Sequence, residues 1–162
     1  MESINVELIT NSPEETQDIG RILGEHALPG QIFLLIGDLG VGKTCISQGV
    51  RWGLGGEEYA TSPTFVLVSE YKARLTMHHI DLYRVGSSED MIELGLEEYL
   101  ADDGISVVEW ADRTIDFFPS DHLKIFMERV DETTRKLRFT TDTSSFASLL
   151  NAVKTSATGG AN

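Results

Sequence analysis

The amino-acid sequence predicts a three-layer α/β fold with a largely parallel sheet that antiparallel strands extend. Two uninterrupted apolar runs, at residues 32–36 and 105–108, have the length of strands buried on both faces, as in parallel sheets. Segments with helical periodicity lie between them, and this alternation indicates strand–helix–strand units. The length of 162 residues allows one compact domain. We assign residues 1–155 to this domain and expect a flexible C-terminal tail at 156–162.

The first helix is predicted to begin at Pro13, because proline is favoured at the first helical position. Ser12 is a suitable N-cap, and Glu15 stands three residues later, where a capping box requires it. The turn at residues 28–30, with the sequence LPG, ends this helix and leads into the strand at 32–36.

A second helix is predicted from Thr44 onward. Its apolar residues recur at a spacing of four, as one helical face requires: Ile46, Val50 and Leu54. Glycines at positions 53, 55 and 56 end the segment.

Two hairpins are predicted from β-rich segments that flank short polar turns. The first joins residues 65–71 to residues 75–80, and the second joins residues 123–130 to residues 136–141. Hairpin strands are antiparallel, so these segments extend the parallel part of the sheet.

Two further helices complete the predicted fold. Ser87 and Asp90 form a helix start, and the apolar residues that follow share one face: Ile92, Leu96, Tyr99 and Leu100. A short final helix is predicted at residues 145–154, before the tail.

The charge balance excludes one class of function. The chain has 13 Lys and Arg against 26 Asp and Glu, a formal net charge of −13, whereas autonomous nucleic-acid binders need a surplus of basic residues. No apolar run approaches the roughly 20 residues of a membrane-spanning helix, and the N-terminus has no export pattern. The single cysteine, Cys45, fits a reducing cytoplasm. Cys45 lies in a first helical turn, where the helix dipole can favour a thiolate. The alternative is that its side chain simply packs beneath the preceding loop.

The segment at residues 37–44, with the sequence GDLGVGKT, directly follows the first predicted strand. It matches the phosphate-loop pattern G-x-x-x-x-G-K-[ST], which needs a strand before it and a helix after it. Glycines let backbone N–H groups turn towards phosphate oxygens, and the helix N-terminus presents a positive dipole to the same anion. Lys43 is expected to reach the β and γ phosphates, and the Thr44 hydroxyl to bind Mg²⁺. The sequence therefore predicts a nucleotide site.

Two acidic residues follow apolar strands and are candidates for the same site. Glu109 ends the strand at 105–108, and Asp81 follows the strand at 75–80. Ligand sites of α/β sheets lie at the carboxyl ends of the strands, where a carboxylate can hold Mg²⁺ and a second group can orient water. We expect both residues in the site, with Glu109 as the metal partner.

Several other features admit two interpretations. Residues 61–64 are either a switch loop that senses the γ-phosphate or an ordinary proline turn. Trp110 either flanks the nucleotide or belongs to the core. The stretch 85–112 has many acids and no Lys or Arg, so it is either a solvated face or a docking surface for a basic partner. His78 and His79 face opposite sides of a strand and cannot chelate one ion together; we expect one to be packed and the other exposed.

Four motifs occur in order: GDLGVGKT at 37–44, SPTF at 62–65, HIDLYR at 79–84 and VEW at 108–110. As a set they closely resemble the bacterial TsaE (YjeE) family, the small ATPase of tRNA threonylcarbamoyladenosine biosynthesis. The resemblance covers nearly the whole chain, from Thr10 to Arg135 in the second hairpin.

The resemblance implies a P-loop ATPase that uses ATP and Mg²⁺ and works in a complex with TsaD-like and TsaB-like subunits. The complex modifies adenosine 37 of tRNAs that read codons beginning with A. Hydrolysis supports turnover of the complex, and the ATPase subunit does not itself transfer the threonylcarbamoyl group. With its net charge of −13, the subunit is expected to bind no tRNA alone and no membrane.

By this match Lys43, Asp81 and Glu109 are the implied catalytic residues. Lys43 binds phosphate, Thr44 and Glu109 hold Mg²⁺, and Asp81 is needed for hydrolysis. The implied nucleotide contacts are Thr10, Asp38, Leu39, Gly40, Val41, Gly42, Lys43, Thr44, Cys45, Trp110 and Arg135, of which Thr10, Trp110 and Arg135 belong to the nucleoside end. Cys45 departs from the family, where threonine or serine is frequent, but the loop binds through its backbone.

Two other functions use the same phosphate loop. A small-molecule kinase would bring an arginine-bearing lid over the phosphates, yet residues 85–112, a natural place for one, contain no basic residue. A non-hydrolysing scaffold that only regulates assembly remains open, because motifs do not encode intrinsic rates.

Overall fold

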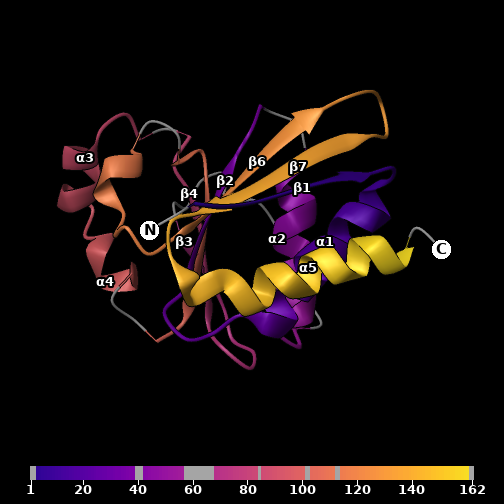
Figure 1. The fold of residues 1–162 in the computed structure, drawn as a ribbon. Coiled ribbons are helices and arrows are strands. Elements are labelled where there is room, and N and C mark those ends of the chain that lie inside the picture. Colours follow the sequence, from indigo (N-terminus) through magenta and orange to yellow (C-terminus); the bar gives the residue numbers. More distant parts are fainter. Residues whose placement is uncertain are drawn as a thin grey trace.

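The structure is a computed structural model that describes residues 3–38, 42–56, 68–83, 85–100, 103–111 and 114–160, with side chains up to Ser156. Within these ranges seven strands form one sheet in the order β1-β7-β6-β2-β5-β4-β3 (Figure 1). The strands are β1 (Ile4–Thr10), β2 (Ile32–Ile36), β3 (Val68–Tyr71), β4 (Met77–Asp81), β5 (Ile105–Glu109), β6 (Leu123–Arg129) and β7 (Arg135–Thr141).

The sheet is mixed. Its central strands β6, β2, β5 and β4 are parallel to one another, whereas every pairing of β1, β7 and β3 is antiparallel. The predicted α/β sheet with antiparallel additions is therefore confirmed, and its parallel part is confined to the four central strands. Both predicted hairpins are present, as β3–β4 and β6–β7. Residues 65–67 of the first hairpin lie outside the described residues.

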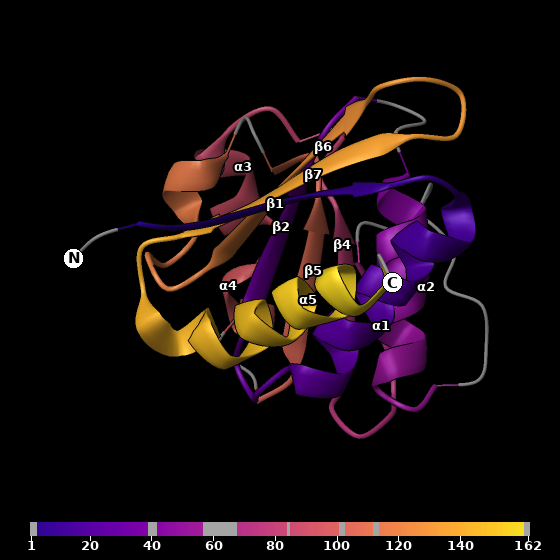
Figure 2. The ribbon, with the colours of Figure 1, turned by 45° about the vertical axis from the view of Figure 1, so that its right-hand side comes forward.

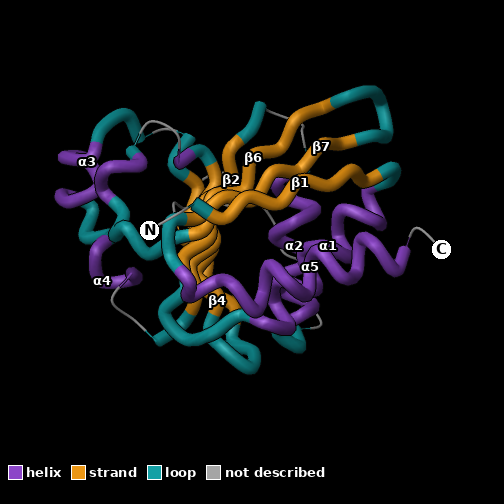
Figure 3. The backbone as a smooth tube through the Cα atoms, viewed as in Figure 1, coloured by secondary structure: helices purple, strands orange, loops and turns teal. Residues whose placement is uncertain are grey.

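Helices cover both faces of the sheet, as the three-layer prediction requires (Figures 1 and 2). They are α1 (Pro13–His26), α2 (Lys43–Gly53), α3 (Ser88–Glu93), α4 (Glu97–Leu100) and α5 (Ala147–Gly160), with 3-10 turns η2 (Ile115–Phe117) and η3 (Ser144–Phe146). Helices α1, α2 and α5 bury one apolar cluster against the sheet, and α3 and α4 bury a second on the other face. Figure 3 shows the strands as a twisted layer between these two groups of helices. No helix among the described residues has the length and apolar character needed to cross a membrane.

Helix α1 begins as predicted. The Ser12 hydroxyl accepts a hydrogen bond from the backbone N–H of Glu15 at 3.1 Å, and Pro13 occupies the first turn. The Glu15 carboxylate accepts in turn from the backbone N–H of Asn11 at 3.3 Å. The first bond satisfies an N–H group that the helix itself leaves unpaired, and the second ties the residue before the N-cap to the first turn.

Glycines let α1 and α2 approach each other at backbone distance. A Cβ added at Gly20 of α1 would lie 2.4 Å from the carbonyl oxygen of Ile46, and one added at Gly49 of α2 would lie 2.1 Å from that of Gln17. Both contacts are too short for any side chain, so the two helices pack at a distance that only glycine permits. This packing fixes α2, and with it the end of the phosphate loop.

Strand β1 was not expected from the sequence. Its side chains alternate between the two faces of the sheet: the inward Leu8 and Thr10 are buried, and Ile9 is exposed. The alternation is the usual signal of a half-buried strand. Strand β1 lies at the sheet edge, where among the described strands it pairs only with β7, far away in the sequence.

The single helix predicted after Ser87 is wrong beyond its first turns. The Ser87 cap is confirmed, since its hydroxyl accepts from the backbone N–H of Asp90 at 3.2 Å. The chain then breaks at Gly95, whose φ of +71° ends α3 before α4 begins. As a result Leu96 is buried whereas Ile92 is 56% exposed, so the two do not share a face.

The C-terminal helix is longer than predicted. A 3-10 turn precedes it, and α5 extends from Ala147 to Gly160 instead of ending at Lys154. The residues expected to form a tail from 156 onward are therefore helical as far as Gly160. Leu149, Leu150 and Val153 bury the first turns against the sheet, and added residues extend a formed helix at low cost.

Candidate functional site

The N-terminus of α2 lies directly after the predicted phosphate loop. Gly42 caps the helix with a φ of +112°, a left-handed conformation that favours glycine. The first turn of α2 carries no acidic residue. Lys43 is 5% exposed and donates a hydrogen bond from Nζ to the carbonyl oxygen of Gly37 at 2.7 Å. This end of the helix therefore combines a positive dipole with a buried cation and suits an anionic ligand.

The other loop residues are placed less completely. Thr44 is exposed on the first turn of α2, and Asp38 is exposed after β2. Leu39, Gly40 and Val41 lie outside the described residues, as does the 61–64 segment predicted as either a switch loop or a proline turn.

Trp110 lies against the phosphate-loop lysine. The Lys43 amino group is 3.3 Å from the centroid of the Trp110 ring, and the Tyr83 ring packs edge-on against Trp110 with centroids 5.0 Å apart. Trp110 has a φ of +63°, a backbone conformation that costs a non-glycine residue about 1 to 3 kcal/mol and clusters at functional sites. Trp110 is half-buried, packs against the second apolar cluster and also lies beside Lys43. It therefore contributes to the edge of the core, and its contact with a nucleotide stays a prediction.

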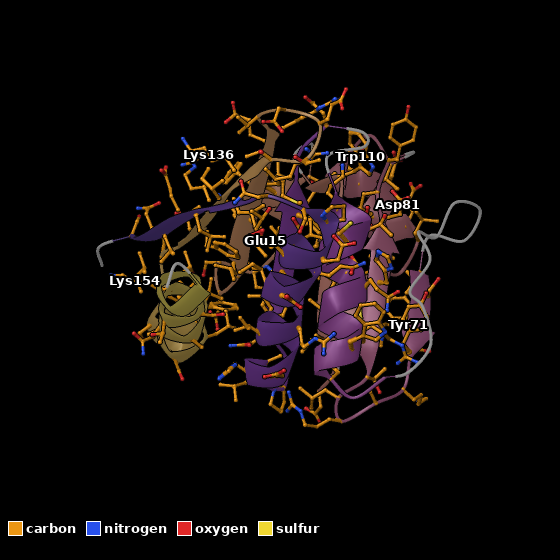
Figure 4. All side chains as sticks on the ribbon, turned by 90° about the vertical axis from the view of Figure 1, so that its right-hand side faces the viewer. Glu15, Tyr71, Asp81, Trp110, Lys136 and Lys154 are labelled. Atoms are coloured by element: carbon orange, nitrogen blue, oxygen red, sulfur yellow. The ribbon has the colours of Figure 1, made fainter. Side chains whose placement is uncertain are left out.

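The two predicted acids lie side by side at the carboxyl edge of the sheet. Strands β4 and β5 are parallel, and their register pairs Asp81 with Glu109. Leu35 near the end of β2 is the other neighbour of Glu109, so the phosphate loop leaves the sheet at the same edge. Asp81 and Trp110 lie at this end, away from Tyr71 of β3 (Figure 4).

The two acids differ in environment. Glu109 is 3% exposed and its Oε2 is hydrogen-bonded to Nε2 of His79. Asp81 is half-buried, and its Oδ1 accepts the backbone N–H of Tyr83 at 2.9 Å. One carboxylate is thus held within the sheet, whereas the other also closes the turn that follows β4.

His79 is a site residue that the sequence analysis missed. We expected one of the adjacent histidines to be exposed, but both are buried: His78 is 1% and His79 is 0% exposed. They face opposite sides as predicted, because successive side chains of a strand alternate. Both are buried because helices cover β4 on each face of the sheet. A usable signal was present, since His79 and Asp81 are two residues apart on a strand and so share a face.

The proposed nucleoside-end residues converge on the first turn of α2. Thr10 is the last residue of β1 and pairs with Arg135, the first residue of β7. Burial raises the pKa of the Cys45 thiol, while the positive charge of Arg135 lowers that pKa and the negative charge of Glu14 raises it. Arg135 and Glu14 therefore lie near Cys45. The raised pKa contradicts the thiolate interpretation of Cys45 and leaves the packing interpretation.

Thr10 and Arg135 are also fixed by local hydrogen bonds. The hydroxyls of Thr10 and Thr16 are 2.7 Å apart, and Thr10 is 2% exposed. Arg135 donates from Nη1 to the carbonyl oxygens of Asp131 at 2.7 Å and Thr134 at 3.0 Å.

An open cavity of about 570 Å³ adjoins the start of the phosphate loop, but the candidate catalytic residues do not line it. It lies against residues 36–38 and the β6–β7 hairpin, and its lining includes Asp38, Lys136 and Arg138. Lys43, Asp81 and Glu109 are not part of this lining. We therefore place the site at the N-terminus of α2 and not in the cavity.

Among the described residues no group of three or more His, Cys, Asp and Glu side chains is arranged to hold a metal ion. A phosphate-loop site requires no such group, because Mg²⁺ bound there takes most ligands from phosphates and water. The residues present, one hydroxyl at Thr44 and one buried carboxylate at Glu109, are the donor types that such a site uses.

Comparison with known proteins gives one consistent family. The family profile described as "Threonylcarbamoyl adenosine biosynthesis protein TsaE" matches residues 10–137. The tRNA threonylcarbamoyladenosine biosynthesis protein TsaE of Bacillus subtilis is 37% identical over 132 residues, which cover 81% of this chain and 82% of the relative. The protein of the same name from Rickettsia bellii is 34% identical over 144 residues, covering 88% and 99%.

A solved structure gives the same assignment. The crystal structure of Bacillus subtilis YdiB superposes with a TM-score of 0.81 at 30% sequence identity, covering 94% of this chain and 96% of that one. The phosphate loop, the paired strand-end acids and Trp110 all lie within the matched residues 10–137. On these matches the chain belongs to the TsaE family of threonylcarbamoyladenosine biosynthesis proteins.

Proposed function

We propose that this TsaE-family protein is a Mg²⁺-dependent ATPase with a P-loop NTPase fold, required for the threonylcarbamoyladenosine modification of tRNA adenosine 37. The observation that carries the proposal is the contact of Lys43, on the N-terminus of α2, with Trp110, which directly follows Glu109. Glu109 and Asp81 are register partners at the carboxyl ends of β5 and β4. A cationic helix start beside paired carboxylates suits a triphosphate and its magnesium ion.

Each residue has a distinct role in this proposal. The backbone N–H groups of Gly42 and the first turn of α2 bind phosphate oxygens, and Lys43 neutralises charge on the terminal phosphates. Thr44 and Glu109 hold the magnesium ion, which when bound withdraws charge from the β and γ phosphate oxygens. Asp81 orients water or supports the metal shell from the adjacent strand.

The nucleoside end is assigned to Thr10, Arg135 and Trp110. Thr10 and Arg135 are neighbours across the β1–β7 pairing, and the charge of Arg135 acts on Cys45 in the first turn of α2. This relationship supports a base or ribose contact beside the phosphate loop. Trp110 supplies an aromatic face against the amino group of Lys43.

We also propose that the protein acts with TsaD-like and TsaB-like subunits in the cytoplasm and leaves tRNA binding to them. A net charge of −13 opposes contact with a phosphate backbone. ATP hydrolysis then drives turnover of the complex, while the threonylcarbamoyl group is transferred elsewhere.

The test measures phosphate release by the protein alone and with the two partner subunits. Strong stimulation by the partners supports the ATPase assignment. Nucleotide binding without turnover, with or without partners, would instead indicate a scaffold, and phosphate transfer to a small molecule would indicate a kinase. The test includes Lys43→Ala, which should release little phosphate. Lys154→Ala is its matched control and should keep the wild-type rate, because Lys154 is an exposed lysine on α5, distant from Trp110 and Asp81 (Figure 4).

A further inference from the structure

We propose that His79 is a positioning residue that fixes the carboxylate of Glu109 for magnesium binding. This inference rests on the proposed function, because it assigns His79 a role towards the metal ligand of that site. His79 itself contacts neither nucleotide nor metal.

The contact crosses two adjacent strands. His79 of β4 lies opposite Val107 in the register, and Asp81 lies opposite Glu109, so the His79 ring meets the Glu109 side chain diagonally. The hydrogen bond joins Nε2 of His79 to Oε2 of Glu109. The histidine therefore reaches the carboxylate from within the sheet, two residues before β4 ends.

Burial makes this hydrogen bond consequential. His79 is 0% and Glu109 is 3% exposed, and a buried carboxylate is unfavourable unless a donor compensates for the lost water. Among the described residues, the hydrogen bond of the Glu109 side chain uses only Oε2. The second oxygen, Oε1, is thereby kept for a ligand, in an orientation that the histidine determines.

The hydrogen-bond roles also follow from the contact. An ionised carboxylate can only accept, so Nε2 of His79 carries the proton. Nδ1 of His79 is buried and has no hydrogen-bond partner within the described part of the chain. With the proton on Nε2, the unpaired nitrogen is an acceptor, and no N–H group is left buried without an acceptor. Histidines and carboxylates paired in this way commonly orient metal ligands from outside the coordination shell.

His78 provides a matched control in the same strand. It is equally buried, at 1% exposure, but faces the other side of the sheet. Its ring packs edge-on against Tyr99 with centroids 5.3 Å apart, and its Nδ1 lies 3.5 Å from the carboxylate of Glu70. A substitution there disturbs the core of β4 without touching Glu109.

The experiment measures how Mg²⁺ changes the affinity for adenylyl imidodiphosphate, a non-hydrolysable ATP analogue, by calorimetry at a series of Mg²⁺ concentrations and in EDTA. In His79→Leu we expect the Mg²⁺ concentration for half-maximal effect to rise about 10- to 100-fold, with the affinity in EDTA unchanged. His79→Gln, whose amide nitrogen can replace Nε2 as donor, should restore the value to within about threefold. His78→Leu should leave it unchanged. Thermal unfolding shows which variants fold.

The outcomes separate the two proposals. If Mg²⁺ tightens binding in the wild type and equally in His79→Leu, or if His78→Leu shows the same loss, the positioning role is wrong and the proposed function stands. If the wild type binds the analogue no more tightly with Mg²⁺ than in EDTA, the magnesium site itself is wrong and the role of His79 fails with it. In a Glu109→Gln background, His79→Leu should cause no further loss of the Mg²⁺ effect, because the two residues act as one unit.

Discussion

The amino group of Lys43 lies 3.3 Å from the centroid of the Trp110 ring, so the phosphate-loop lysine and the residue that follows Glu109 form a cation–π pair. The pair joins the N-terminus of α2 to the end of β5. A ligand that draws Lys43 towards its phosphates changes the electrostatic environment of the indole ring.

This pair predicts a fluorescence signal. In a Trp52→Phe background, which removes the other tryptophan, Mg²⁺-ATP should change the emission of Trp110 because its cationic neighbour moves or acquires a counter-charge. In the same background, Lys43→Ala should change the emission without any nucleotide. Titration at constant protein concentration measures both, and an emission spectrum that nucleotide leaves unaltered would contradict the placement.

If the proposed function is correct, Lys43→Ala should lower ATP hydrolysis by about 10²-fold or more, because it removes the cation that we propose neutralises the terminal phosphates. The fold should survive, since the change removes a side chain at a helix end and adds a strong helix former. Phosphate release measured beside circular dichroism tests this. Normal hydrolysis by Lys43→Ala would show that Lys43 is not the phosphate-binding lysine. The control variant Lys154→Ala should retain the wild-type rate.

Asp81→Asn should lower hydrolysis by about 10²-fold while nucleotide affinity changes by less than about threefold. The amide oxygen can still accept the hydrogen bond of the Tyr83 backbone N–H, so the turn after β4 is kept. Comparing phosphate release with calorimetric affinity separates the two effects. A parallel loss of affinity and rate would assign Asp81 to binding and not to the chemical step.

Cys45 tests the position of Arg135. Burial raises the pKa of the thiol, so alkylation by iodoacetamide at pH 8 should be slower than for an ordinary cysteine, because less thiolate is present. Arg135→Gln removes the charge that lowers this pKa and should slow alkylation further, whereas Glu14→Gln should accelerate it. Each change should be about twofold to threefold, below the tenfold of a full pKa unit. Equal rates in all three proteins would place Arg135 and Glu14 away from Cys45.

Gly20→Ala and Gly49→Ala should each lower the free energy of unfolding by about 1 to 3 kcal/mol or more, because a Cβ would meet backbone atoms at 2.4 Å and 2.1 Å. Gly86→Ala is the control, since a Cβ added there would meet no atom of the described residues within 4 Å beyond its own chain neighbours. Urea unfolding followed by circular dichroism measures all three. Wild-type stability in Gly49→Ala would show that the helices do not pack at this distance.

The sequence anticipated the elements whose signals are local. The Ser12 cap, the buried strands and both hairpins are set by neighbouring residues, and each is present. Strand β1 was not predicted from the sequence, because it is stabilised by pairing with β7, more than a hundred residues away along the chain. The break between α3 and α4 at Gly95 was not predicted, because one glycine within an apolar pattern is compatible with either a continuous or a divided helix.

The features of the candidate site also fall into those that local sequence sets and those that only the tertiary structure sets. The sequence by itself determined the phosphate-loop pattern at 37–44, and it determined that Asp81 and Glu109 end buried strands, because these depend on spacing along one segment. Only the tertiary structure decided that Asp81 and Glu109 are register partners, that His79 holds Glu109 and that Arg135 acts on Cys45. Those relationships join separate segments, and they depend on which strands become neighbours and in what register. Burial of both faces of the sheet selects that arrangement, and no local pattern specifies it.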